Sequence, residues 1–255
     1  MLHSQKQGET SKIVTLFSKE FGKIAVMAKG SRGTKSKYLG TLETFNHIDV
    51  LLYKKEGRGL QYLSQASIIE PFQDIHTKLG KMSLASIPCE IISRGEEKNH
   101  PHPQAFKLLL DSLNALEHSD NNLRNIVRVF QMHYIVMSGF EPRLNACHYC
   151  GKENPDTINY FSLEHGFYSC DHCGALQDSF RLSDNAIKFL RWFSQVTPAD
   201  AGNAVVRPAV GKECDFFLYN YLRAHIEAMA TLKAVEHLLK LENDFSKTAT
   251  KPQRP

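Results

Sequence analysis

Short β-branched runs separated by glycine-containing turns dominate the first 70 residues. Residues 13–17 (IVTLF) and 24–28 (IAVMA) are two such runs, and the segment between them contains Gly22. A pair of runs joined in this way is typical of a β-hairpin.

Two more strands are predicted after this hairpin. A long one is expected from about Leu42 to Tyr53 and another from Leu60 to Ile69, joined by a turn at residues 56–59. Several strands with glycine turns and no helical period predict a small antiparallel barrel that ends at Glu70-Pro71.

The apolar period changes from about Lys78 onward. Apolar residues now recur at intervals of three and four, which predicts amphipathic helices over about 79–91, 106–116, 126–137, from Ser183 onward, and in two pieces from Lys212 to Leu241. Pro88 is expected to kink or interrupt the first of these helices. Asn121 or Asn122 is expected to cap the third, and Gly139 to end it.

Composition adds few constraints beyond an ordinary globular class. The 255 residues are 42% hydrophobic and 23% charged, and no apolar run approaches the ~18 residues of a membrane span. The N-terminus carries no apolar secretory region. Six cysteines, four of them in CxxC pairs, favour a reducing cytoplasmic location over a disulfide framework.

Charge is unevenly distributed. Residues 1–70 carry 11 Lys/Arg against 6 Asp/Glu, whereas the other 185 residues carry 20 against 21. A basic N-terminal quarter joined to a neutral body predicts a polyanion-binding module.

The positive charge concentrates after the first hairpin. No acidic residue occurs from Phe21 to Leu42, and the cations predicted to contact a phosphate backbone are Lys23, Lys29, Arg32, Lys35 and Lys37. A solvated loop without a ligand is the alternative. Aromatic rings for base stacking would come from Phe17, Phe21, Tyr38, Phe45, Tyr53 or Tyr62, most of which we expect in the core.

Four cysteines form the strongest motif in the chain. Cys147-x-x-Cys150 and Cys170-x-x-Cys173 lie 19 residues apart, and each pair is followed by a glycine, Gly151 or Gly174, suited to a positive φ. This spacing predicts one tetrahedral zinc ion per chain. Four thiolates leave no open coordination position, so the zinc would be structural. Replacement of a cysteine ligand by His148, His165 or His172 is disfavoured because both pairs are intact.

No motif for catalysis is present. The chain has no GxSxG, Walker, HExxH or GxGxxG signature and no deaminase arrangement, so we expect a protein that is not an enzyme. Arg124 and Arg128, one helical turn apart beside apolar residues, could receive an acidic hydrophobic peptide; an ordinary exposed pair is the alternative.

The order of these motifs resembles the RecO family of bacterial recombination mediators. The segments GETSKIVTLF (8–17), FGKI (21–24), AKGSR (28–32), LETF (42–45) and GFEPRL (139–144), followed by the first CxxC, carry the resemblance over most of the chain. It implies an α+β protein: an N-terminal OB-fold β-barrel, then an all-α domain with an inserted four-cysteine zinc-ribbon-like module.

The resemblance also implies a role. RecO-like proteins bind single- and double-stranded DNA and anneal complementary strands. With RecR, in the RecFOR pathway, they help load RecA onto DNA coated with single-strand DNA-binding protein. They also bind the acidic C-terminal tail of that coating protein. The resemblance assigns DNA contacts to Lys29, Arg32, Lys35 and Lys37, and it assigns the metal site to the four cysteines. It also places Arg128 near the helix that binds the acidic tail. The expected location is the cytoplasm, at the nucleoid.

Domain boundaries follow from these expectations. We expect an OB-fold DNA-binding domain at 1–72, a helical domain at 73–143 and 180–242, a zinc module at 144–179 and a disordered tail at 243–255. Relatives begin with an apolar strand whose end matches Leu2-His3-Ser4, so the first strand is expected to be cut short. The rival interpretations are a non-catalytic zinc-containing interaction scaffold and a metalloenzyme.

Overall fold

The computed structural model describes residues 1–53, 57, 59–153, 158–238 and 240, and it is a mixed α+β structure. The chain forms two compact units. Unit 1 comprises residues 1–118 and the segment from Leu232 onward, and unit 2 comprises Ser119–Thr231.

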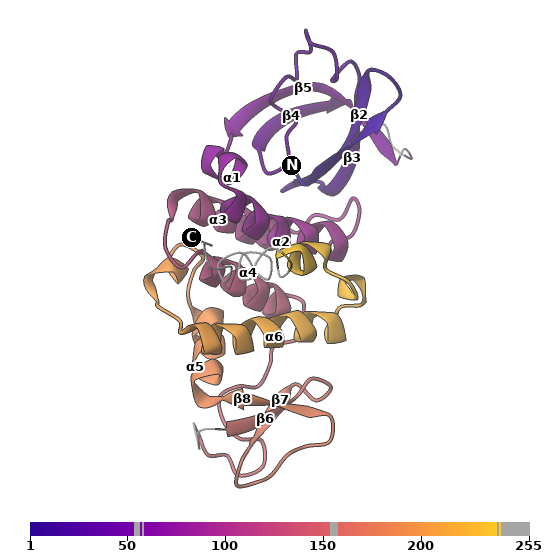
Figure 1. Ribbon diagram of the computed structural model, residues 1–255. Coiled ribbons are helices and arrows are strands. Elements are labelled where there is room, and N and C mark those ends of the chain that lie inside the picture. The colour runs from indigo at the N-terminus through magenta and orange to yellow at the C-terminus, as the bar shows by residue number, and fades with distance from the viewer. Residues whose placement is uncertain (54–56, 58, 154–157, 239, 241–255) are drawn as a thin grey trace, which may run out of the picture. The chain divides into compact units, whose positions relative to one another are not determined.

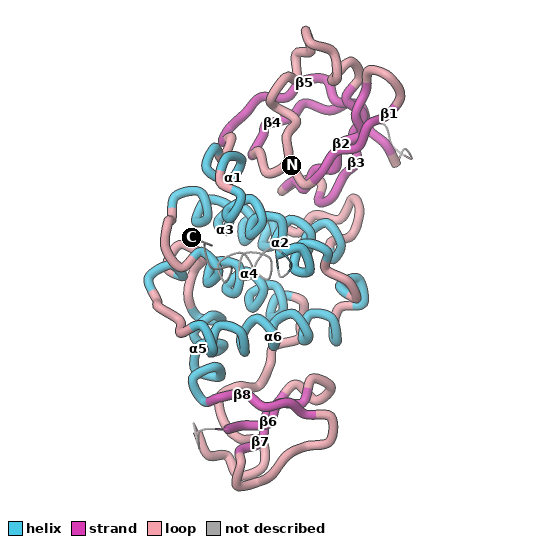
Figure 2. Tube along the Cα trace, in the orientation of Figure 1, coloured by secondary structure: helices cyan, strands magenta, loops and turns pink. Residues whose placement is uncertain are grey.

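Unit 1 begins with a five-stranded sheet. Its strands are β1 (His3–Gln7), β2 (Ser11–Ser18), β3 (Gly22–Ala28), β4 (His47–Tyr53) and β5 (Leu60–Glu70). The strand order is β1-β2-β3-β5-β4, and the predicted hairpin is the β2–β3 pair. The strands curl around a common interior (Figures 1 and 2), which holds the apolar residues Val14, Leu16, Val26, Tyr38, Leu42 and Leu63.

The sheet is not a closed antiparallel barrel. β3 pairs with β5 in parallel, and in the described part of the chain no strand pairing joins β1 to β4. The Met1 ammonium donates to Asn46 O (2.7 Å) and Phe45 N–H donates to Met1 O (2.9 Å), so the start of the chain contacts the residues just before β4. The open sheet is consistent with the expected OB-fold, which is itself a partly open barrel. β1, expected to be cut short, pairs with β2 along all five residues.

The strand predicted from Leu42 starts only at His47. Phe45 has a φ of 76°, which no strand residue adopts. The Asn46 amide donates to the carbonyls of Gly40 and Thr41 at 3.0 Å, which stabilises a turn in place of extended chain. The turn expected at 56–59 includes residues 56 and 58, which lie outside the described residues.

Three helices follow the sheet in unit 1: α1 (Gln73–Thr77), α2 (Leu79–Gly95) and α3 (Pro103–His118). The ring of Phe106 lies 6.1 Å from that of Phe17 and 6.3 Å from that of His47, so α3 packs on the sheet. α2 continues through the buried Pro88, which therefore does not interrupt it.

The chain returns to unit 1 near its end. Residues 233–238 are helical, and the Glu90 carboxylate of α2 accepts the N–H groups of Lys233 (3.1 Å) and Ala234 (2.6 Å). These amides open the helix and have no partner within it, so Glu90 satisfies them. The expected disordered tail at 243–255 lies outside the described residues.

Gly22, the first residue of β3, tests the contact between the β2–β3 hairpin and the segment before α3. Its φ is +65°, and an added Cβ would lie 1.9 Å from the carbonyl oxygen of His100. Gly22→Ala is expected to destabilise the protein by about 2 kcal/mol more than Gly8→Ala, because both substitutions strain a positive φ but only the first creates an overlap. Gly8 has a φ of +60° and open space around its Cα. Equal losses in denaturant unfolding would contradict this contact.

Unit 2 combines three helices with a small sheet. The helices are α4 (Leu123–Met137), α5 (Asp184–Gln195) and α6 (Pro208–His225), with short 3₁₀ turns η1 (Ala201–Asn203) and η2 (Glu227–Met229). The strands β6 (Ile158–Ser162), β7 (Phe167–Cys170) and β8 (Ser179–Ser183) are ordered β7-β6-β8. The rings of Phe161, Phe217 and Tyr221 pack where the sheet meets α6.

The helix ends in unit 2 agree only in part with those predicted from the sequence. The Ser183 hydroxyl accepts the Ala186 N–H, as expected for the start of α5, and Gly139 (φ 86°) follows α4. Asn122 precedes α4 but does not cap it with its side chain, which donates to Gly202 O instead. The two units also divide the predicted helical domain, because α1–α3 belong with the N-terminal sheet and α4–α6 with the cysteine-bearing sheet.

Candidate metal centre and nucleic-acid interface

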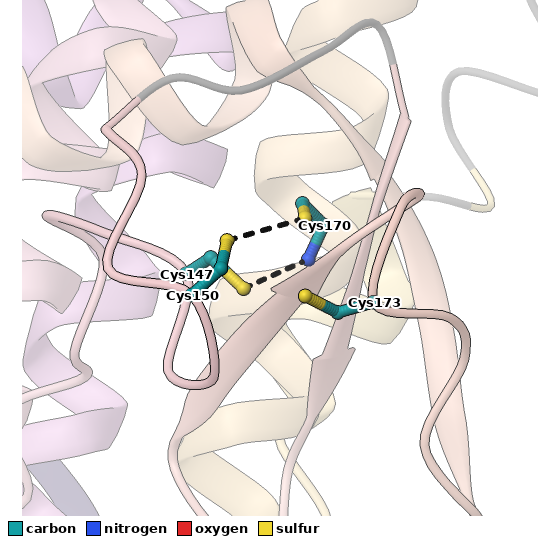
Figure 3. Close-up of side chains that lie close together, drawn as sticks. All are labelled: Cys147, Cys150, Cys170 and Cys173. Atoms are coloured by element: carbon teal, nitrogen blue, oxygen red, sulfur yellow. Dashed lines mark hydrogen bonds between the residues drawn. The ribbon is translucent and has the colours of Figure 1, made fainter.

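The four cysteines converge at one end of the small sheet. Cys147 and Cys150 lie in the loop before β6, Cys170 ends β7, and Cys173 lies in the turn that follows. Their four sulfur atoms are all within 4.8 Å of one another, with Cys150 Sγ and Cys170 Sγ 3.7 Å apart (Figure 3). A tetrahedral metal–thiolate site with bonds of ~2.3 Å requires sulfurs about 3.8 Å apart. The predicted cluster is therefore positioned to bind a metal ion.

Backbone groups support this arrangement. Gly151 (φ 68°) and Gly174 (φ 87°) adopt the positive φ that the sequence predicts, and their N–H groups donate to Cys147 O and Cys170 O. The Cys170 N–H donates to Cys147 Sγ at 3.3 Å. Burial of Cys147 opposes its ionisation, but the amides of Cys150, Cys170 and Tyr149 outweigh burial and lower the pKa of the Cys147 thiol to about 6. The lowered pKa favours the thiolate at Cys147, whereas burial raises the pKa of the Cys170 thiol and the hydrogen bond with Cys170 raises that of Cys173 to about 12.

Two of the neighbouring histidines, His148 and His165, have other partners. The His148 ring stacks on Phe167 with centroids 3.8 Å apart, and His165 Nδ1 lies 3.0 Å from the Ser162 hydroxyl. In the described ranges, the only group of three or more His, Cys, Asp or Glu residues arranged to hold a metal is the four cysteines.

The basic segment between β3 and β4 is held against the sheet. Arg32 donates from its guanidinium to Gly8 O (2.7 Å) and from its N–H to Thr10 O (3.0 Å), while Lys37 Nζ donates to Ser64 O (2.6 Å). Lys29 Nζ lies 4.8 Å from the centre of the Tyr62 ring. Lys29, Arg32, Lys35 and Lys37 are all exposed. The structure thus brings four of the five predicted cations together on one ordered segment, which we call the basic loop.

Lys23 is separate from the basic loop. Its side chain is half-buried, and Nζ donates to Ser93 O of α2 at 2.5 Å. Burial, with the nearby Lys98 adding to it, lowers the pKa of Lys23. The ammonium of Lys23 joins β3 to α2, so this side chain is not part of the exposed basic loop.

Burial divides the aromatic residues considered for base stacking. Phe17, Tyr38 and Phe45 belong to the core, at 4–7% exposure. Phe21 is 41% exposed, beside the start of β3, Tyr53 is 69% exposed, and Tyr62 is half-buried. Tyr53 and Tyr62 lie on β4 and β5, and the basic loop contacts β5 through Lys29 and Lys37.

Arg128, predicted to receive a partner's tail, is committed to the interior of unit 2. Its side chain is 7% exposed and donates to both carboxylate oxygens of Asp215 on α6, at 2.7 and 2.9 Å. It also donates to Asn125 Oδ1 and Gly211 O. Arg124 lies 3.5 Å from the same carboxylate. Sequence reasoning missed Asp215, which is 87 residues from Arg128 and bears no motif. The exposed-peptide role is accordingly not proposed for Arg128.

No helix in the described part of the chain combines the length and apolar character that a bilayer crossing requires.

Comparison with known proteins agrees with the order of these features. The family model "Recombination protein O N terminal" matches residues 1–72, and "Recombination protein O C terminal" matches residues 76–233. The DNA repair protein RecO of Thermoanaerobacter sp. (strain X514) is 27% identical over 237 residues, which cover 92% of this chain and 93% of the relative. RecO of Bacillus pumilus (strain SAFR-032) is 28% identical, with 97% of each chain covered.

A third relative is more similar over a shorter stretch. RecO of Dehalococcoides mccartyi (strain ATCC BAA-2266 / KCTC 15142 / 195) is 31% identical over 195 residues, 76% of each chain. With both family models matching in sequence order and relatives aligned over nearly the full length, this chain belongs to the RecO family of DNA repair and recombination proteins.

Proposed function

We propose that this protein binds single- and double-stranded DNA through its basic loop and anneals complementary strands. The observation that carries the proposal is the position of Lys29, Arg32, Lys35 and Lys37 on one exposed, hydrogen-bonded segment of the N-terminal sheet. The hydrogen bonds of Arg32 and Lys37 hold this segment in place, so phosphate binding would release counterions with little further cost of ordering the loop.

The metal would be zinc, in a structural role. Four cysteine sulfurs at tetrahedral spacing suit zinc, and a fourfold thiolate shell offers no position for a substrate or an activated water. Cys147, Cys150, Cys170 and Cys173 would hold the ion, and the ion would cross-link the loop before β6 to the end of β7. The protein would act without catalysing a reaction.

Family membership supports a mediator role within this proposal. With RecR, the protein would help load RecA onto DNA coated with single-strand DNA-binding protein and would bind that protein's acidic tail. It would act in the cytoplasm, at the nucleoid. The tail site is not assigned to Arg128, whose donors are already used within unit 2.

The proposal is tested by binding of fluorescent single- and double-stranded oligonucleotides across a salt series, together with an annealing assay. We expect affinity to fall linearly with salt on logarithmic axes and annealing to exceed the spontaneous rate. A protein-interaction scaffold, the alternative, would bind partner proteins but neither oligonucleotide. That result would refute the proposed function.

A further inference from the structure

A row of apolar and aromatic side chains crosses four strands of the unit 1 sheet. Tyr53 of β4 pairs in register with Tyr62 of β5, Tyr62 pairs with Met27 of β3, and Met27 pairs with Ile13 of β2. Residues directly opposite each other on neighbouring strands project to the same face. These four residues therefore lie side by side and are defined here as the outer row.

The outer row is on the solvent side of the sheet. The positions next to it along the strands, Val14, Val26 and Leu63, point into the core and are 0–7% exposed. In contrast, Tyr53 is 69% exposed, and Leu51, two residues before it on the same face, is 57% exposed. Tyr62, Met27 and Ile13 are half-buried, so the row is most open to solvent at its Tyr53 end. Rings and aliphatic groups occupy this face, where the alternation of a strand ordinarily places polar residues.

Two cations of the basic loop contact β5, one at the outer row itself and one beside it. Lys29 Nζ lies 4.8 Å from the Tyr62 ring centre, and Lys37 Nζ bonds Ser64 O two residues farther along the strand. Asp49 is the acidic residue on the same face of β4, and it pairs with Ser67, toward the opposite end of the strand from Tyr53. The outer row therefore combines flat rings with positive charge at one end of the sheet.

We infer that bases of a single-stranded nucleic acid stack on Tyr53 and Tyr62 while its phosphates contact Lys29 and Lys37. The inference rests on the proposed function and specifies which state of the nucleic acid this surface recognises. A neutral or basic peptide would gain nothing from the lysines, and a duplex keeps both faces of its bases stacked. An unpaired strand satisfies both the rings and the cations.

The test separates stacking from phosphate contact by using two oligonucleotides of equal length, one of thymidines and one abasic throughout. The unmodified protein is expected to bind the thymidine oligomer more tightly. Tyr53→Ala and Tyr62→Ala should each weaken thymidine binding about 10-fold, leave abasic binding unchanged and preserve the salt slope. Tyr53→Phe, which keeps the ring, should bind as the unmodified protein does.

Tyr53→Ala is the decisive variant, because the Tyr53 side chain is exposed and its removal leaves no cavity. Tyr219→Ala, on α6 of unit 2, is the control for removal of a tyrosine ring outside this sheet. Equal binding of the two oligomers by the unmodified protein, or a Tyr53→Ala loss of the same size on both oligomers, would overturn the stacking role. In that case salt-dependent binding would leave the proposed function intact. Failure of the unmodified protein to bind either oligomer would overturn both.

Discussion

Replacing Lys29, Arg32, Lys35 and Lys37 together with glutamine is expected to weaken binding to single-stranded DNA by about 100-fold at 0.1 M salt. Each lost phosphate contact should also reduce the slope of log affinity against log salt by about 0.7. The four side chains are exposed, so glutamine can replace them without leaving a cavity or a buried unpaired group. Fluorescence anisotropy at several salt concentrations measures both quantities.

A charge-matched control distinguishes this interface from a general effect of net charge. Four exposed cations outside the basic loop serve the purpose: Lys107, Lys188, Arg207 and Lys212. Their quadruple glutamine variant has the same net charge as the loop variant but should keep nearly all of the affinity and the slope. If the two variants lost affinity equally, the DNA contacts would not be localised on the basic loop.

Cys170→Ser is expected to abolish metal binding and lower the melting temperature by about 10 °C or more. Cys170 is 1% exposed, and its sulfur belongs to the cluster that joins β7 to the loop before β6. Loss of one ligand removes a site that contributes directly to folding. Zinc analysis should give one ion per chain before the substitution and none after it, and differential scanning calorimetry gives the melting temperature.

Cys89→Ala is the control, because Cys89 is also a buried thiol but lies on α2 in unit 1. It should retain the metal and lose only the stability of a small cavity, about 1 kcal/mol. A strong chelator should reproduce the Cys170→Ser melting temperature in the unmodified protein. Retention of zinc and of the melting temperature by Cys170→Ser would show that the cluster is not a structural metal site.

Local patterns were sufficient to predict much of the fold. The β-branched runs around Gly22 correctly predicted the β2–β3 pair, and Ser183 correctly predicted the start of α5. The late start of β4 could not be predicted, since it depends on Asn46 reaching carbonyls five and six residues earlier and on the positive φ of Phe45. The parallel pairing of β3 with β5 is likewise a tertiary property.

The candidate sites, too, were predictable where local spacing determines them and unpredictable where contacts between distant residues do. CxxC spacing predicted the sulfur cluster because two short turns fix where the sulfurs point. The sequence grouped Lys23 with the loop cations and suggested Arg128 as a contact for a partner's peptide. Both side chains are instead drawn partly or fully into the fold by partners far away in the chain, Ser93 and Asp215. Only burial separates Tyr53 and Tyr62 from the core aromatics.

The contact of Glu90 with Lys233 and Ala234 has a consequence for biosynthesis. A ribosome releases the N-terminal sheet and α1–α3 first, then all of unit 2, and only afterwards the residues that give Glu90 its amide partners. Unit 1 is therefore begun first and completed last. A chain whose translation stops within unit 2 would lack part of unit 1 as well, so a nascent chain acquires the complete unit 1 only after the cysteine-bearing unit 2 has emerged.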